Sequence, residues 1–294
     1  MSIFNRRIEE EGGKSEMSFI DHLEALRMHI IRSVLAILIM AIVIFYFRNW
    51  IFDNIITGPL NEHFITYRAM CHLGHLLHLG NSLCVPPVKI NMQSNTFGGQ
   101  FLSSITLAFV GGIIAAFPYI FWEFWRFIKP ALKKKETQNT RFIIFWVSFF
   151  FFAGAAFGFF MLGPFTFNFL GGFQLGTQHL VDTRPTLADY FDNLTNIILG
   201  CGIAFELPVL AVLLTRIGLI TPSFLKRSRK YAIVIILIVA AFITPSPDWY
   251  SQMIVFTPLM CLYELSIIVS KRAYKQYTAN DDKPGEDEQE KEWS

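Results

Sequence analysis

The sequence is poor in charge and in cysteine. Only 16% of its 294 residues are charged, whereas about a quarter of a soluble domain is charged. This is too little charge to cover the surface of a soluble fold of this size. The 25 Lys and Arg residues nearly balance the 23 Asp and Glu residues, and a formal charge of +2 is too small for a nucleic-acid-binding face. Four cysteines are too few for a disulfide-built scaffold, and no C-x-x-C pair indicates a zinc or thiol-redox site.

Signatures of nucleotide-driven and hydrolytic enzymes are also missing. The Gly13-Lys14-Ser15 segment ends like a P-loop, but Ile8 occupies the position of the first glycine. The sequence contains no H-E-x-x-H, no G-x-S-x-G and no G-x-G-x-x-G at a strand–helix turn. We therefore predict a protein that is not an enzyme and has no catalytic residue and no cofactor.

Apolar residues are in excess and gather in long runs. Hydrophobic residues make up 53% of the chain, and Phe alone occurs 31 times. Four runs reach the roughly 20 residues that a helix needs to cross a bilayer, and two further runs are shorter. We predict an all-α polytopic membrane protein with six transmembrane helices, of which the short fifth and sixth form a hairpin. The runs are Met28–Phe47, Phe101–Trp122, Phe142–Leu162, Leu194–Leu214, Tyr231–Ile243 and Gln252–Val269.

Lys and Arg residues lie mostly on one side of these runs. If the six runs alternate in direction, all 25 fall on the side of the two termini except Arg48, Arg68, Lys89 and Arg184. Cytoplasmic loops of membrane proteins carry the excess of Lys and Arg. We therefore predict that both termini are cytoplasmic and that the opposite loops are periplasmic.

The runs divide the chain into three parts. Residues 1–27 form a predicted cytoplasmic head, 28–270 a transmembrane domain with a long first periplasmic loop at 48–100, and 271–294 a cytoplasmic tail expected to be disordered. Apolar residues in the head recur at helical spacing. We predict an amphipathic helix that lies on the membrane surface and runs into the first span, although an interfacial anchor alone would give the same periodicity. These apolar residues are Phe19, Leu23, Leu26 and Ile30.

Glu206 is the most informative single residue, because it lies inside an apolar span. A carboxylate there costs roughly 2.5–3.5 kcal/mol on insertion scales, so we expect it to face a cavity or a polar partner. A structural bond to a neighbouring helix is the alternative. Pro208, two residues later, frees backbone carbonyls and permits a kink.

Two glutamates lie in the cytoplasmic segment Trp122–Glu136, at the end of the second apolar run. Aromatic residues at the membrane boundary and the lysines that follow them fit the usual interfacial pattern. Glu123 and Glu136 are not explained by that pattern. By itself, a carboxylate among lysines such as Glu136 is usually a solvated ion pair.

The first periplasmic loop contains a group of potential metal ligands. Cys71, His75 and His78 could share a helical face, but no acidic group lies nearby and Gly74 weakens a helix. Cys71 and Cys84 allow a simpler interpretation, because the periplasm permits stable disulfides. We predict a Cys71–Cys84 disulfide and no metal site. Two free thiols, or a metal bound by Cys71, His75 and His78, are the alternatives.

Short motifs stand at defined points relative to the runs. They are His22–Arg27, Gly58–Leu60, Phe117-Pro118, Phe127–Leu132 with Glu136, Phe205–Pro208, Thr244–Asp248 with Ser251-Gln252, and Cys261–Glu264. Each motif alone is weak, but their order and placement form a specific set. Over nearly the whole chain, from about Phe19 to Val269, the sequence resembles the TatC family, the multi-span subunit of the twin-arginine protein translocase.

The resemblance implies a fold and a function. The fold is a concave, glove-like bundle of six transmembrane helices with short fifth and sixth helices, in the bacterial cytoplasmic membrane. The implied function is to bind the Arg-Arg signal peptides of folded proteins and, with single-span TatA/TatB-type subunits, to move these proteins across the membrane using the proton-motive force. Membrane lipid and further copies of the chain in a homo-oligomer are the other implied partners.

Two adjacent arginines need carboxylates, because guanidinium–carboxylate pairs are charge-assisted and can be bidentate. By resemblance, these carboxylates come from the N-terminal helix and from the first cytoplasmic loop. This chain has Ala25 where the family motif has a glutamate, and Glu24 is rotated from that position by about 100°. Whether Glu24 substitutes for the missing glutamate is left open. The candidate signal-peptide-binding residues are Glu24, Arg27, Phe127, Pro130 and Glu136.

The remaining motif residues have other predicted roles. Gln252 is a second candidate for polar contact inside the membrane, besides Glu206. A competing function is a proton-coupled small-solute transporter that uses Glu206 as its relay. Such a transporter should contain several intramembrane polar groups and broken-helix repeats, and the sequence shows no internal repeat. The predicted structural motif residues are Pro59, Pro118, Pro208, Asp248 and Glu264.

Overall fold

The structure is a computed structural model that describes residues 19–61, 63–76, 78, 84, 91–129, 140–173, 184–216, 218–245 and 249–281. Within these residues every regular element is a helix, and an isolated β-bridge joins Gln93 to Thr186. The predicted all-α class is confirmed.

The helices follow one another with few long connections. In chain order they are α1 (Phe19–Tyr46), α2 (Arg48–Ile51), the π-helix η1 (Phe52–Ile56), the 3₁₀-helix η2 (Gly58–Leu60), α3 (Ile65–Leu76), α4 (Gly99–Ile128), α5 (Thr140–Phe157), the π-helix η6 (Gly158–Leu162), α6 (Gly163–Gly172), α7 (Leu187–Ala204), α8 (Leu207–Arg216), α9 (Pro222–Arg227), α10 (Arg229–Ile243) and α11 (Trp249–Asp281).

Among the described residues, five helical segments are long and apolar enough to cross a membrane. The fifth predicted span corresponds to α10, which has 15 residues and rises only about 22 Å. The chain is therefore a multi-pass membrane protein, and six spans remain a prediction. The five segments are Glu24–Tyr46, Gly99–Ile128, Ile143–Gly172, Leu187–Thr215 and Ser251–Lys275.

Most of the long helices extend beyond the predicted runs. The surface helix expected before the first span is continuous with it in α1, because nothing between residues 19 and 46 breaks the helix. Helical structure also continues from α5 through η6 into α6, beyond the predicted end of the third run at Leu162. The last helix is 33 residues long rather than short, and it continues past residue 270 into the segment predicted to be disordered. In α1 and α11, polar residues extend the helix beyond the apolar run that marked it.

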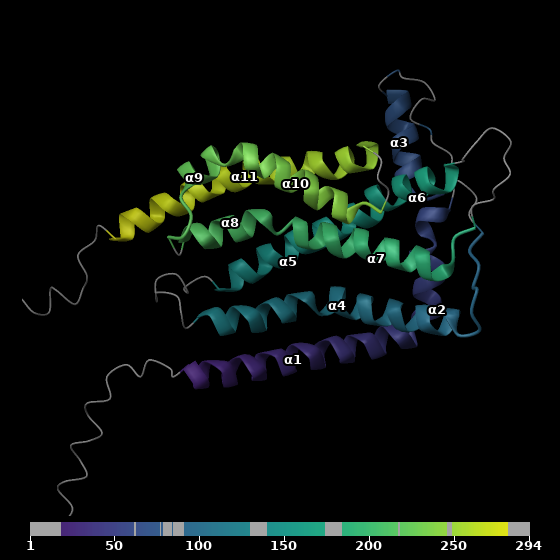
Figure 1. Ribbon diagram of the computed structural model, residues 1–294, viewed down its shortest axis with the longest axis horizontal. Coiled ribbons are helices and arrows are strands. Elements are labelled where there is room, and N and C mark those ends of the chain that lie inside the picture. Colours follow the sequence, from purple (N-terminus) through teal and green to yellow (C-terminus); the bar gives the residue numbers. More distant parts are fainter. Residues whose placement is uncertain are drawn as a thin grey trace, which may run out of the picture.

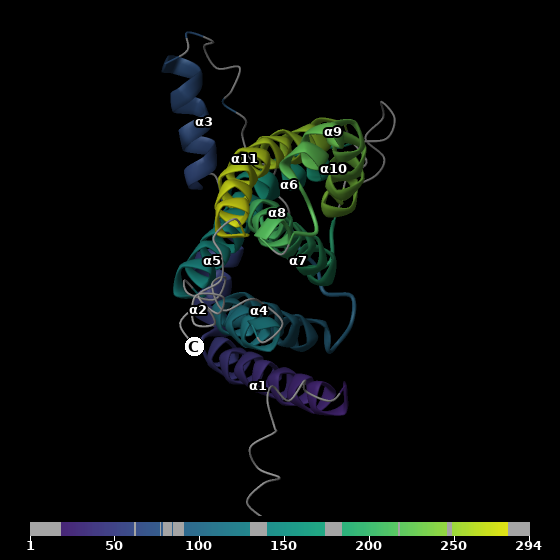
Figure 2. The same ribbon diagram turned by 90° about the vertical axis from the view of Figure 1, so that its left-hand side faces the viewer.

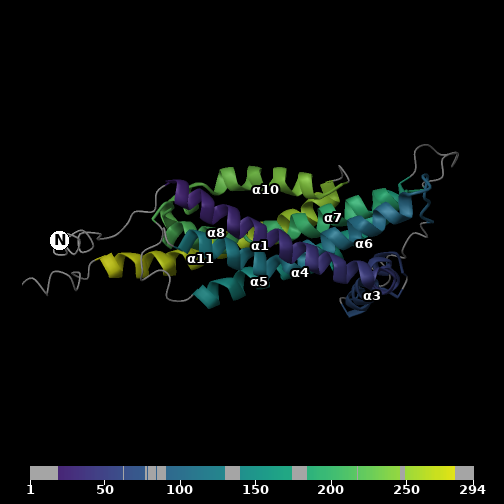
Figure 3. The same ribbon diagram turned by 90° about the horizontal axis from the view of Figure 1, so that it is seen from below.

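The long helices lie side by side along the molecule (Figure 1). α1 is the outermost of them and packs chiefly on α4, across which it lies (Figure 3). α7 packs on α5, α8 packs on α11, and α10 packs on α11. In the end-on view of Figure 2, α10 and α11 lie on the side away from α1, and α3 projects from the bundle.

The two ends of the bundle differ in charge. The start of α1 and the ends of α4 and α11 lie at one end of the bundle, and α3 lies at the other (Figure 1). We call these the basic end and the α3 end. Near the basic end the described basic side chains are Arg27, Arg32, Arg126, Lys129, Lys226, Arg227, Arg229, Lys230, Lys271, Arg272 and Lys275; near the α3 end they are Arg48, Arg68 and Arg184.

A proline interrupts the fourth long segment beside Glu206. α7 ends at Ala204 and α8 begins at Leu207. Pro208 has no N–H, and its ring would clash with the carbonyl of Ala204 in a continuous helix. The Glu206 N–H instead donates to the oxygen of Ile203, at 3.1 Å. The sequence predicted a kink here, and the structure places Glu206 within the break.

Glycines allow two pairs of helices to approach closely. A Cβ on Gly112 of α4 would lie 2.9 Å from the backbone nitrogen of Ala41 in α1. A Cβ on Gly154 of α5 would lie 2.4 Å from the oxygen of Cys201 in α7. Both distances are too short for a real side chain, so these positions require glycine, as is common where membrane helices touch.

We expect Gly154→Val to destabilise the bundle by about 1–3 kcal/mol, the usual cost of overpacking a core. Thermal unfolding of the purified protein in detergent measures this effect. Gly98→Val is the matched control, because a Cβ on Gly98 meets no atom within 4 Å. Equal melting of the two variants would show that α5 and α7 do not approach this closely.

Candidate functional sites

The first candidate site lies at the basic end, where α1 begins and α4 ends. Glu24 and Arg27 are exposed on α1, whereas Ala25 is partly buried. Phe127, in the last turn of α4, contacts the His29 ring edge-on, with the ring centroids 6.2 Å apart. Pro130 and Glu136 lie outside the described residues.

A buried carboxylate joins α1 to α4 at this end. Glu123 is only 1% exposed, and its Oε2 lies 2.5 Å from Nδ1 of His29. Its Oε1 accepts a hydrogen bond from the Tyr119 hydroxyl at 2.9 Å and lies 3.7 Å from the Arg126 guanidinium. We call His29, Tyr119, Glu123 and Arg126 the His29–Glu123 cluster.

The cluster explains why a glutamate is tolerated inside α4. A buried carboxylate is costly unless it is paired and hydrogen-bonded, and each Glu123 oxygen has a partner. The sequence showed that Glu123 did not fit the interfacial pattern, but it did not identify His29 as the partner. The sequence could have indicated Tyr119 as a partner, because it lies four residues before Glu123 and residues four apart share a helix face. His29 is 94 positions away in the chain, so only the folded structure could reveal it.

Glu206 is the second candidate site. Its residue is 8% exposed, and Oε1 has no hydrogen-bond partner among the described residues. The break between α7 and α8 places this carboxyl group inside the bundle. A partner supplied from outside the chain would satisfy it.

The last two helices are joined by polar contacts of motif residues. Gln252 of α11 donates through Nε2 to the oxygen of Leu237 in α10 at 2.9 Å, so its described contact is with α10 and not with Glu206. Arg229, at the start of α10, pairs with Glu264 of α11, with NH2 2.6 Å from Oε2. Asp248 lies outside the described residues.

Other motif prolines lie in structural positions. Pro118 is inside α4. Pro59 is buried in η2, and its oxygen accepts a hydrogen bond from the Tyr67 hydroxyl at 3.1 Å. Burial raises the pKa of Tyr67 to about 12, while a hydrogen bond with Asn168 acts in the opposite direction. The phenol therefore stays protonated at neutral pH and ties α3 to η2.

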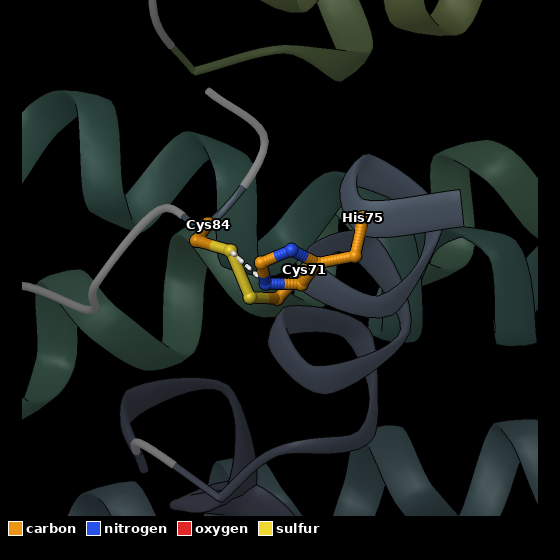
Figure 4. The surroundings of a disulfide bond; sticks show 3 residues. All are labelled: Cys71, His75 and Cys84. Atoms are coloured by element: carbon orange, nitrogen blue, oxygen red, sulfur yellow. Dashed lines mark hydrogen bonds between the residues drawn. A yellow bond between two sulfur atoms is a disulfide. The ribbon is translucent and has the colours of Figure 1, made fainter. Parts of the chain in front are cut away.

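At the α3 end a disulfide joins Cys71 to Cys84, with a Cα–Cα separation of 4.3 Å. His75 lies beside it, with Nε2 4.0 Å from the Cys84 sulfur (Figure 4). The compartment argument from the sequence predicted this pairing. In the disulfide form the two sulfurs are not thiolates, so the three residues do not form a metal site.

The fold and these contacts define a class: a multi-pass, all-helical membrane protein whose candidate sites are polar groups between helices. The chain belongs to the TatC family, described as Sec-independent protein translocase protein, whose model matches residues 21–258. It is thus a bacterial inner-membrane protein of a protein translocase.

Individual relatives match over most of their length. The TatC protein of Blattabacterium sp. subsp. Periplaneta americana is 42% identical over 260 residues, covering 87% of this chain and 96% of the relative. The TatC of Desulforapulum autotrophicum is 32% identical over 271 residues, covering 91% of this chain and 89% of the relative. A crystal structure described as the twin arginine translocase receptor TatC is 31% identical, with a TM-score of 0.64 over 86% of this chain and 99% of that one.

We expect non-reducing mass spectrometry to recover a crosslinked Cys71–Cys84 peptide. The chain-entropy model gives about 3 kcal/mol of local stabilisation for a loop of this size, so reduction should increase proteolysis near α3. Cys201 and Cys261 are free and serve as internal controls that alkylate without reduction after denaturation. Recovery of unlinked, alkylated Cys71 and Cys84 from unreduced protein would contradict the disulfide.

Proposed function

We propose that this chain is the receptor subunit of its translocase, binding Arg-Arg signal peptides of folded proteins and nucleating the translocation complex. The observation that carries the proposal is the similarity over 99% of a solved chain described as the twin arginine translocase receptor. The exposed Glu24 near the start of α1 supports it, because carboxylates pair strongly with guanidinium groups.

The proposed orientation places the basic end in the cytoplasm. Most described basic side chains gather there, as the positive-inside rule requires. In this orientation α10 completes a set of six spans and both termini are cytoplasmic. Signal peptides then meet the start of α1 and the loop after α4 from the side on which cargo is made.

Glu206 is proposed to bind a partner helix. Its carboxyl group is buried and Oε1 is unpartnered within the described chain, and an unsatisfied polar group in a membrane protein costs several kcal/mol. A polar side chain from a single-span TatA/TatB-type subunit, or from the inserted signal hairpin, would satisfy it. The family membership does not favour the solute-transporter alternative.

The receptor proposal is tested by crosslinking the purified protein to an Arg-Arg signal peptide and to its Lys-Lys variant. We expect strong preference for the Arg-Arg peptide, because arginine forms bidentate pairs that lysine cannot. Glu136→Ala should weaken Arg-Arg binding, since losing one partner of a desolvated charge pair costs about 2–5 kcal/mol and less when exposed. Equal labelling of both peptides would refute the receptor proposal.

Glu24→Ala in the same assay decides whether Glu24 replaces the glutamate missing at Ala25.

Substitutions at Glu206 should separate stability from partner binding. Glu206→Leu removes an unpartnered buried carboxyl, so the isolated chain should melt no lower than the wild type. The same variant should lose export of a twin-arginine reporter, whereas Glu206→Gln keeps hydrogen-bonding groups and should retain much of it. Full export by Glu206→Leu would leave Glu206 without a role in partner binding.

A further inference from the structure

The His29–Glu123 pair is a directional bond in a contact that is otherwise apolar and tightly packed. α1 packs chiefly on α4, and Gly112 and Gly111 of α4 let Ala41 and Ile44 of α1 approach closely. Apolar contacts have no preferred direction, so they permit small rotations and shifts of a peripheral helix. A hydrogen bond fixes distance and angle. The pair therefore sets the rotation and height of α1 on α4.

The residues around the pair belong to both segments of the proposed receptor site. Glu24 and Arg27 lie in the turns of α1 just before His29, and Ala25 lies one turn before His29 on the same side. Phe127 contacts His29 from the end of α4, and the chain beyond α4 leads to Glu136. A shift of α1 against α4 would change the separation of the two segments.

We propose that His29 and Glu123 are positioning residues for signal-peptide recognition: their bond holds the start of α1 in register with the end of α4. This inference rests on the proposed receptor function. Glu123 does not itself contact the signal peptide, because both of its oxygens are already bonded and the residue is 1% exposed. The His29–Glu123 bond acts by fixing the spacing of the groups that contact the signal peptide.

Charge adds to the role of Glu123. Arg126 lies 3.7 Å from its Oε1. Removing the negative charge would leave the Arg126 guanidinium uncompensated near the approach of a ligand that carries two arginines. Glu123→Gln should therefore weaken Arg-Arg binding at least as much as a change at His29.

The first test measures binding of a fluorescent Arg-Arg signal peptide to the full-length protein in nanodiscs. His29→Leu and Glu123→Gln should each weaken binding about tenfold, and the double variant should be no weaker than the worse single one, because coupled partners are not additive. His29→Asn keeps an N–H donor near the Nδ1 position and should recover most of the affinity. Thermal melting of each variant checks that it remains folded.

Which of the two His29 variants binds the peptide more tightly distinguishes a positioning role of His29 from a packing role. Leu fills the space of the imidazole without a polar donor, so a packing role would favour Leu over Asn. Arg229→Gln is the matched control, because it breaks an ion pair between α10 and α11 near the same end of the bundle. It should change the affinity by less than about twofold.

A second test reads the register without any peptide. Spin labels are attached at Glu24→Cys and Lys129→Cys in a background without Cys201 and Cys261. They report the distance between the start of α1 and the end of α4. The distribution should be narrow in the parent, broaden with His29→Leu and stay narrow with Arg229→Gln. An unchanged distribution in His29→Leu, or wild-type affinity in that variant, overturns the positioning role. Absence of any Arg-Arg preference in the parent overturns the receptor function instead, while the spin-label result still decides whether the pair sets the register.

Discussion

The structure depends on one constraint: a polar group inside a membrane bundle must find its partner within protein, because the hydrocarbon offers none. Helices satisfy their own backbone groups, and the described regular structure is helical throughout. Several side chains inside the bundle follow the same rule by bonding across helices. The Gln252 amide bonds to a backbone oxygen of α10, the Tyr190 hydroxyl to the oxygen of Ile56, and Thr215 to Ser270.

The two buried glutamates of the spans meet this constraint in opposite ways. Glu123 has a partner on each oxygen, and its bond to His29 joins helices that are far apart in sequence. Glu206 lies in a helix break and has an oxygen with no partner in the described chain. A satisfied buried carboxylate fixes a geometry, whereas an unsatisfied one is stabilised by whatever binds it. The first therefore suits the positioning of a surface site and the second suits assembly with a partner.

Close backbone contacts and polar bonds both hold the bundle together, and they constrain it in different ways. Gly112 and Gly154 allow helices to touch at backbone distance, which maximises dispersion contacts where the hydrophobic effect cannot draw helices together. These contacts fix how near two helices lie. The polar bonds, at His29 with Glu123 and at Arg229 with Glu264, fix rotation near the basic end.

The sequence by itself determined the class of the protein. Scarce charge and long apolar runs allow only a helical membrane protein, and the placement of Lys and Arg predicts its orientation, because both follow from transfer energies that act on single residues. It also located the break at Pro208, which depends on a missing N–H and not on any neighbour. Helix ends were predicted less well: α1 and α11 extend into polar residues, since hydropathy marks what lies in lipid and not where a helix stops.

Only the tertiary structure decided which polar residues meet. His29 and Glu123 are 94 positions apart, and the sequence around either residue does not indicate that it pairs with the other. From the sequence, Gln252 was a candidate for polar contact inside the membrane, and the structure identifies the backbone oxygen of Leu237 as the atom it bonds. Such pairings depend on how helices rotate and pack against one another, which is a collective result of many weak contacts along their length. A residue type can show that a partner is needed, but the fold selects the partner.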